Sequence, residues 1–289
     1  MVWFILSLLT ALAVATHDAW LKKFFSHLRI YEMLTYPLLY SFPLFLVTLP
    51  FVPVPSLDRT FLFAFLISFP LNVLGFFLHI RAIQISPLSL TLPYLSFTPV
   101  FMLFTGFVVL GEMPNPSGIL GIAIICAGGY IINVEAGRHS LMAPLRAIFR
   151  ETGSWLMLLV AFIYSLGAVV GKQAIIHSSA LFFSITFFTV FTILAPLALL
   201  AAGKIKLRTF KSEVGKGIIA GVLFFAHAVL HNVAISLTKA AYMISVKRLS
   251  LVFGLFYGGV IFKEKNIAMR IIGTLLMAAG AVLITLKGK

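Results

Sequence analysis

Two adjacent basic residues, Lys247 and Arg248, stand inside a long apolar stretch that covers residues 240–262. The pair follows Lys239 by about eight residues, which corresponds to a depth of ~12 Å if the stretch is a helix that crosses a membrane. A charge at such depth costs on the order of 2.5–3.5 kcal/mol on insertion scales, so two neighbouring cations need a reason. Their side chains could snorkel toward the nearer headgroups. Alternatively, they could bind an anion, because Arg supplies a planar fork and Lys a movable point charge for phosphate or carboxylate.

A polar stripe accompanies the cationic pair. At 100° per residue, Lys247 shares one helix face with Ser250 and Tyr257. The stretch 88–110 carries a similar face with Tyr94 and Thr98. We expect the two faces to meet across a central cavity. The predicted substrate-binding residues are Lys247, Arg248, Ser250, Tyr257, Tyr94 and Thr98.

The elements that must position these residues are apolar runs close to the ~20 residues that span a bilayer as a helix. We identify ten, at residues 2–20, 33–52, 60–80, 88–110, 117–134, 154–172, 180–202, 217–237, 240–262 and 267–286. They are continuously apolar, whereas the strands of a membrane barrel would alternate apolar and polar residues. The predicted fold class is therefore all-α, with ten transmembrane helices in a multi-pass integral membrane protein.

The composition supports this class and argues against several others. Hydrophobic residues make up 61% of the 289-residue chain and charged residues only 10%, far below the ~25% usual in soluble domains. The net charge of +14 is spread over short connections, which favours membrane lipids rather than nucleic acid as a partner. The single cysteine, Cys126, excludes an intrachain disulfide. The 29 phenylalanines are expected mainly to face lipid.

The two halves of the chain resemble each other. A shift of 152 positions superimposes His79 on His231 and Glu112 on Glu264, together with several glycine pairs, without a gap. Earlier in the halves the shift is 150. We therefore predict two five-helix repeats, at residues 1–134 and 154–289, joined by a basic linker at 135–153. An odd number of spans in each repeat makes the second copy inverted, as in many secondary transporters whose substrate site lies near the midplane.

Short motifs recur at matching places in the two halves. The first half contains Ile85-Ser86-Pro87-Leu88, Pro99-Val100-Phe101, Leu110-Gly111-Glu112, Gly121-Ile122 and Gly128-Gly129. This pattern resembles the EamA-type branch of the drug/metabolite transporter (DMT) superfamily, although the second half has Lys263-Glu264 in place of Gly-Glu. The Lys-Arg pair is similar to the one with which the triose-phosphate and nucleotide-sugar branches hold phosphate. The resemblance implies a ten-helix permease that works by alternating access, placed in the cytoplasmic membrane of a prokaryote.

These observations predict a secondary transporter of a small anionic metabolite, such as an organic phosphate or carboxylate. A coupling proton or a counter-substrate would be a further partner, and the oligomeric state stays open. Within transport, the alternatives are a flippase of lipid-linked phosphate and an exporter of drugs or amino acids. A non-transporting membrane receptor or scaffold is the alternative of another class. The chain lacks HExxH, GxSxG and a pair of intramembrane aspartates, so we expect no enzyme activity, no metal site and no cofactor.

Three polar residues within the spans have more than one reading. His79 and His231 occupy equivalent positions in the repeats, which favours a structural role over proton transfer. Asp18 is predicted in the last turn of the first helix, where it would neutralise Lys22 at i, i+4 spacing. Proton coupling is the less favoured reading of Asp18.

The distribution of Lys and Arg predicts the orientation in the membrane. The connections after the first, third, fifth, seventh and ninth spans hold 15 of the 22 basic residues, and the opposite side holds 5. The positive-inside rule then places both termini outside the cytoplasm, whereas the resemblance implies that both lie inside. We follow the charge count, so a reporter fused after Lys289 should be inactive if it works only in the cytoplasm. Activity of that fusion would reverse the assignment.

Overall fold

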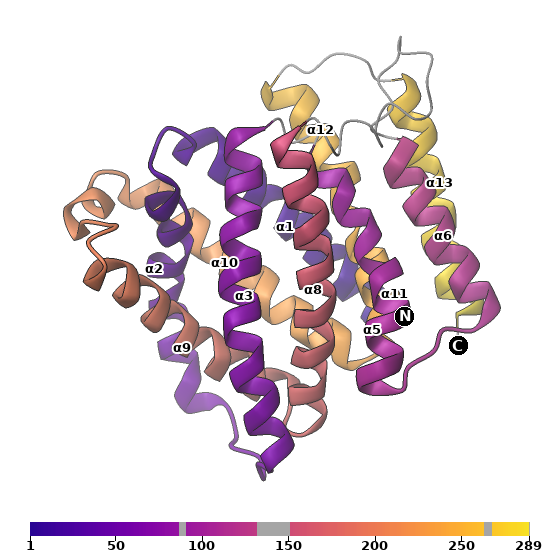
Figure 1. Cartoon of the computed structure of the whole chain (residues 1–289), viewed down its shortest axis with the longest axis horizontal. Coiled ribbons are helices and arrows are strands. Elements are labelled where there is room, and N and C mark those ends of the chain that lie inside the picture. The colour runs from indigo at the N-terminus through magenta and orange to yellow at the C-terminus, as the bar shows by residue number, and fades with distance from the viewer. Residues whose placement is uncertain (87–90, 132–150, 263–267, 289) are drawn as a thin grey trace.

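The computed structural model describes residues 1–86, 91–131, 151–262 and 268–288, and all regular structure in these ranges is helical (Figure 1). The elements are α1 (Val2–Phe25), α2 (Ile30–Thr48), η1 (Leu49–Phe51), α3 (Arg59–Ile85), η2 (Leu92–Phe97), α5 (Thr98–Leu110), α6 (Pro116–Ile131), α8 (Thr152–Ile176), α9 (Ala180–Ala201), η3 (Leu207–Lys211), α10 (Val214–Ser236), α11 (Ala240–Lys247), α12 (Ser250–Phe262) and α13 (Ala268–Lys287). The predicted linker, up to residue 150, lies outside the described residues, and so does Glu264.

Ten apolar helical segments account for the predicted spans. Seven segments in the described part of the chain are long and apolar enough to cross a membrane, and three shorter apolar helices follow at Tyr94–Leu110, Pro116–Ile131 and Ile272–Lys287. The all-helical, multi-pass membrane architecture predicted from the sequence is therefore confirmed.

Three helices continue several residues beyond their predicted ends, and one of them is α3, which ends at Ile85 rather than residue 80. α1 ends at Phe25 rather than residue 20, because Leu21 and Phe25 are fully buried and carry its apolar face past the two lysines between them. α8 ends at Ile176 rather than residue 172. As a result Asp18 lies two turns before the end of α1, and not in its last turn as the sequence predicted.

Helices of one repeat pack against helices of the other repeat in exchanged pairs. α1 packs along α10 while its counterpart α8 packs along α3, and α6 packs along α13 at one edge of the molecule (Figure 1). Glycines bring the last pair together. A methyl group on Gly128 would lie 2.6 Å from the carbonyl oxygen of Gly273, and one on Gly280 would lie 2.6 Å from that of Gly121. Because the 152-residue shift pairs Gly121 with Gly273 and Gly128 with Gly280, the contacts are exchanged about a pseudo-twofold axis.

Two equivalent lysines tie helix ends to backbone carbonyls within their own repeat. Lys22 of α1 donates hydrogen bonds to the carbonyls of Ile83 and Ser86, at 2.7 and 2.6 Å. Lys172 of α8 donates to the carbonyl of Thr238 at 2.6 Å, and it also pairs with Glu112. The second carboxylate oxygen of Glu112 accepts the N–H of Ala240 at 2.8 Å, at the first residue of α11. Glu112 thus joins the end of α8, the end of α5 and the start of α11.

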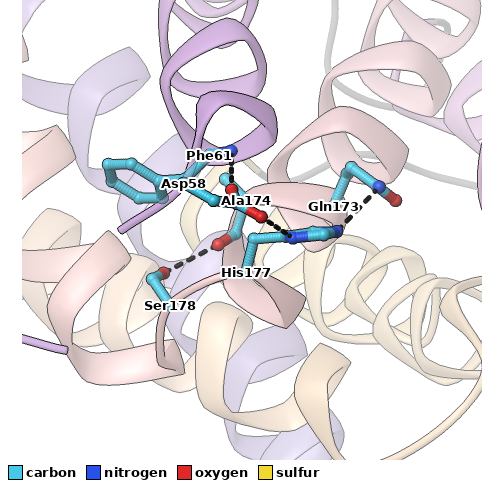
Figure 2. A network of polar contacts seen from close by, with 6 residues as sticks. All are labelled: Asp58, Phe61, Gln173, Ala174, His177 and Ser178. Carbon is cyan, nitrogen blue, oxygen red and sulfur yellow. Dashed lines mark hydrogen bonds and ion pairs between the residues drawn. The ribbon is translucent and has the colours of Figure 1, made fainter. Parts of the chain in front are cut away.

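A smaller network fixes the start of α3 against the end of α8. Oδ1 of Asp58 accepts the backbone N–H of Phe61 at 2.8 Å, and Oδ2 lies 2.7 Å from Nδ1 of His177, which ends α8 (Figure 2). The other ring nitrogen of His177 lies 3.3 Å from Nε2 of Gln173 (Figure 2). The hydrogen bond from Phe61 holds the pKa of the Asp58 carboxyl below its ordinary value, and His177 adds to this effect.

The Glu112–Lys172 pair generates a prediction about stability. Glu112→Gln would leave the Lys172 ammonium, whose side chain is only 6% exposed, without its carboxylate. Breaking one partner of a buried pair costs about 3–5 kcal/mol, so the melting temperature in detergent should fall by several degrees. The matched control is Glu213→Gln, which removes the exposed Glu213–Lys216 pair and should change stability by at most about 1 kcal/mol. Equal melting temperatures for the two variants would contradict this role of Glu112.

Candidate functional site

A cavity of about 140 Å³ lies between the two repeats. Its walls come from α1, α3, η2, α8, α9, α10 and α11. The polar lining residues are His17, Asp18, Asn72, His79, Tyr164, His227, His231, Asn232, Lys247 and Arg248. A cavity that lies among membrane spans and is lined by ionisable side chains is the strongest candidate for a functional site in the described part of the chain.

The ninth span is not a continuous helix, as the sequence suggested, but is broken at the cationic pair. α11 ends at Lys247, Arg248 and Leu249 form a turn, and α12 begins at Ser250. The fourth span is interrupted at the equivalent place, where η2 gives way to α5 at Thr98. Thr98 and Ser250 are related by the 152-residue shift, so each repeat contributes a half-helix that begins at the same position. Broken helices at membrane depth occur where the backbone is buried in protein or lines a cavity.

The two cations line the cavity and make few contacts there. Nη2 of Arg248 donates to Oγ1 of Thr98 at 2.7 Å, at the start of α5, whereas its buried Nε has no hydrogen-bond partner. Nζ of Lys247 lies 3.3 Å from Nδ1 of His231, which is placed to accept a hydrogen bond. Neither cation has a carboxylate within ion-pair distance among the described residues.

A carboxylate and two imidazoles form a second polar group in the cavity. Asp18 is only 3% exposed, and its Oδ1 lies 3.2 Å from Nε2 of His79 and 3.5 Å from Nδ1 of His17. The distance between Asp18 and His79 suits an ion pair, but the orientation of the two groups is not that of a hydrogen bond. Both ring nitrogens of His79 therefore lack a hydrogen-bond partner. Asp18 therefore faces histidines in the cavity, while Lys22, its predicted partner, binds backbone carbonyls.

Phenylalanines form the apolar wall of the cavity. Phe183, Phe187 and Phe191 succeed each other at intervals of four residues on α9, and all three are buried. Phe76, Phe188 and Phe224 complete the wall. The expectation that phenylalanine mainly faces lipid does not hold for this group, because one face of α9 packs inward against α3 and α10.

The structure separates the six predicted binding residues. Lys247 and Arg248 line the cavity, and Thr98 is joined to it through Arg248. Tyr94 and Ser250 are buried outside the lining, and the hydroxyl of Tyr257 lies 2.7 Å from that of Thr16 on α1. The break between Lys247 and Ser250 explains this result, because the single helical stripe assumed from the sequence does not exist.

Sequence reasoning missed the contributions of α1, α3 and α10 to the site. His17, His227 and Asn232 line the cavity but were not among the predicted binding residues. A signal for α10 was present, since Phe224, His227 and His231 follow helical spacing and form one face. The role of Asp18 was obscured because the first helix was predicted to end at residue 20, which placed Asp18 at a helix end rather than inside the helix.

Comparisons with known proteins agree with this architecture. No curated protein sequence matches the chain. A solved crystal structure aligns with 99% of this chain and 96% of its own, with a TM-score of 0.69 and 14% sequence identity, which supports the shared fold alone. The sequence model described as the EamA-like transporter family matches residues 1–134 and 151–286, two segments that together include nearly all of the chain. With its paired repeats, its broken helices and its central polar cavity, this chain belongs to the EamA-like transporter family of membrane transporters.

Proposed function

We propose that the protein transports a small organic anion, with a carboxylate or phosphate head and an apolar body. The observation that carries this proposal is the imbalance of charge in the cavity. Among the described lining residues, Lys247 and Arg248 are cationic and Asp18 alone is anionic. The free Nε of Arg248 adds an unsatisfied buried donor. An anionic head would satisfy donors and offset the net positive charge.

The broken helices support an anion at the same place. Thr98 and Ser250 begin half-helices, and the N-terminal end of a helix carries partial positive charge. Arg248 reaches Thr98, so the guanidinium lies at the start of α5. The positive charge of Arg248 and the partial positive charge of the helix ends thus both favour an anionic ligand.

The aromatic wall restricts the rest of the ligand. Six phenylalanines line the cavity and supply no hydrogen bonds to hydroxyl groups. A sugar phosphate would leave hydroxyls facing them without partners, at a cost of about 1–3 kcal/mol each. An apolar or aromatic body is favoured over a phosphosugar.

An amino acid is the second candidate, because Asp18 in the same cavity could face an ammonium group. The matched compounds 3-phenylpropionate, phenylalanine and phenethylammonium share one body and differ only in charged groups. We expect 3-phenylpropionate to raise the melting temperature of the purified protein and phenethylammonium to have no effect. Stronger stabilisation by phenylalanine would favour the amino acid. Stabilisation by phenethylammonium alone would refute the anion proposal.

Transport itself is tested by counterflow in liposomes. Liposomes that contain the protein and are loaded with unlabelled 3-phenylpropionate should take up the labelled compound from outside faster than protein-free liposomes do. A protein that binds the compound without counterflow would be a receptor or scaffold.

The cationic pair gives the sharpest mutational prediction. Lys247→Ala and Arg248→Lys should each weaken binding of 3-phenylpropionate by more than about tenfold, roughly 1.4 kcal/mol. Lys247→Ala removes a poorly compensated buried charge and should leave the melting temperature of the protein without ligand equal or higher. Lys239→Ala, at the outer end of the same helix, is the control and should bind normally. Unchanged affinity in both cavity variants would identify Lys247 and Arg248 as snorkelling anchors.

A further inference from the structure

We propose that His79, paired with Asp18, binds a proton that crosses the membrane together with the anion. This inference rests on the proposed anion site and adds a second binding site to the same cavity. The geometry that carries it is a buried imidazole, 5% exposed, whose Nε2 lies 3.2 Å from a buried carboxylate. Both ring nitrogens of His79 are without a hydrogen-bond partner, so the imidazole is not held in a structural network.

The surroundings of His79 decide whether it can gain a proton. The other titratable or charged groups that face the cavity are His17 and Asp18 from α1, Tyr164 from α8, His227 and His231 from α10, Lys247 from α11, and Arg248 from the turn that follows α11. α9 contributes only phenylalanines to the lining. Of these groups, Asp18 is the one carboxylate, and a carboxylate within about 4–6 Å favours the charged form of a neighbouring imidazole.

The equivalent histidine in the second repeat has the opposite environment. His231 corresponds to His79, but its Nδ1 lies 3.3 Å from the ammonium of Lys247. A cation so close disfavours protonation, and the neutral ring can instead accept a hydrogen bond. His227 contacts the ring of His17, with centroids 5.4 Å apart, rather than a carboxylate. His79 is therefore the histidine best placed to hold a proton, and His17, 3.5 Å from Asp18, is its nearest substitute.

The anion and the proton then assist each other through charge. With neutral histidines, the described lining carries two cations and one anion, and an arriving anion cancels the excess. The arriving negative charge lowers the cost of a proton on His79, and by reciprocity a protonated His79 strengthens anion binding. The consequence is symport of a proton with the anion.

The test uses benzenesulfonate as the probe, because it keeps its negative charge across the pH range and takes up no proton itself. The purified full-length protein is mixed with the probe at pH 7 in weak buffer, and proton uptake is read with an indicator dye while the Kd is measured. We expect a fraction of one proton to be taken up per bound probe, and the Kd to fall by about threefold or more between pH 8 and pH 6.

Three variants separate a proton site from a structural role. His79→Gln should bind benzenesulfonate with little proton uptake and little pH dependence. Asp18→Asn should also take up less proton, yet bind the probe at least as tightly, because it removes a negative charge from the cavity; a merely damaged protein would bind more weakly. His177→Gln changes a histidine that pairs with Asp58 outside the cavity, and should take up protons like the wild type.

The outcomes distinguish this inference from the proposed function. Binding of benzenesulfonate by the wild type without proton uptake would overturn the proton site and leave the anion site standing. Uptake that is unchanged in His79→Gln and Asp18→Asn would also overturn it. If the wild type binds neither benzenesulfonate nor 3-phenylpropionate, the anion site is overturned, and the proton site with it.

Discussion

The cost of keeping two cations inside a membrane governs the centre of this protein. Lys247 and Arg248 are adjacent in the chain, so their repulsion cannot be relieved by separating the two residues. The structure interrupts the helix at the pair, directs Arg248 toward Thr98 and places Lys247 beside a neutral hydrogen-bond acceptor. One buried donor still has no partner. The described cavity lining therefore carries an excess of positive charge, and this excess is what an anion would bind to.

A symmetric scaffold carries an asymmetric set of side chains. The repeat relates Asp18 to Ala168, His17 to Gly167, Lys247 to Leu95 and Arg248 to Ser96. All of these positions except Ser96 line the same cavity, yet in each pair only one of the two residues is ionisable. Packing needs the symmetry, because exchanged contacts such as Gly128 against Gly273 require both copies. Binding needs the asymmetry, because two copies of the same cation would repel each other across the axis.

Much of the architecture was predictable because its signals are local and repeated. Continuous apolar runs predict the spans, and gapless recurrence of His79 and Glu112 predicts the duplication. The cationic pair was predictable for the same reason, since charge inside an apolar run is conspicuous. The break after Lys247 was not, because Arg248 and Leu249 have no residue type that ends a helix, and the interruption depends on tertiary contacts such as that with Thr98. The meeting of Asp18 with His79 also escaped prediction, because α1 and α3 are distant in sequence and only folding brings these side chains together.

The ends of the molecule are connected to its centre by short pieces of chain. Lys172 and Glu112 both bind the segment that leads into α11, the eight-residue helix that ends at Lys247. At the equivalent place in the other repeat, Lys22 binds the carbonyl of Ser86, just before the chain returns through η2 to Thr98. In the second repeat the lysine bridge is thus joined, through one short helix, to a residue that lines the cavity. Because α11 has only eight residues and Glu112 holds its first residue, we expect a change of charge at Lys247 to act on the segment that Lys172 and Glu112 bind.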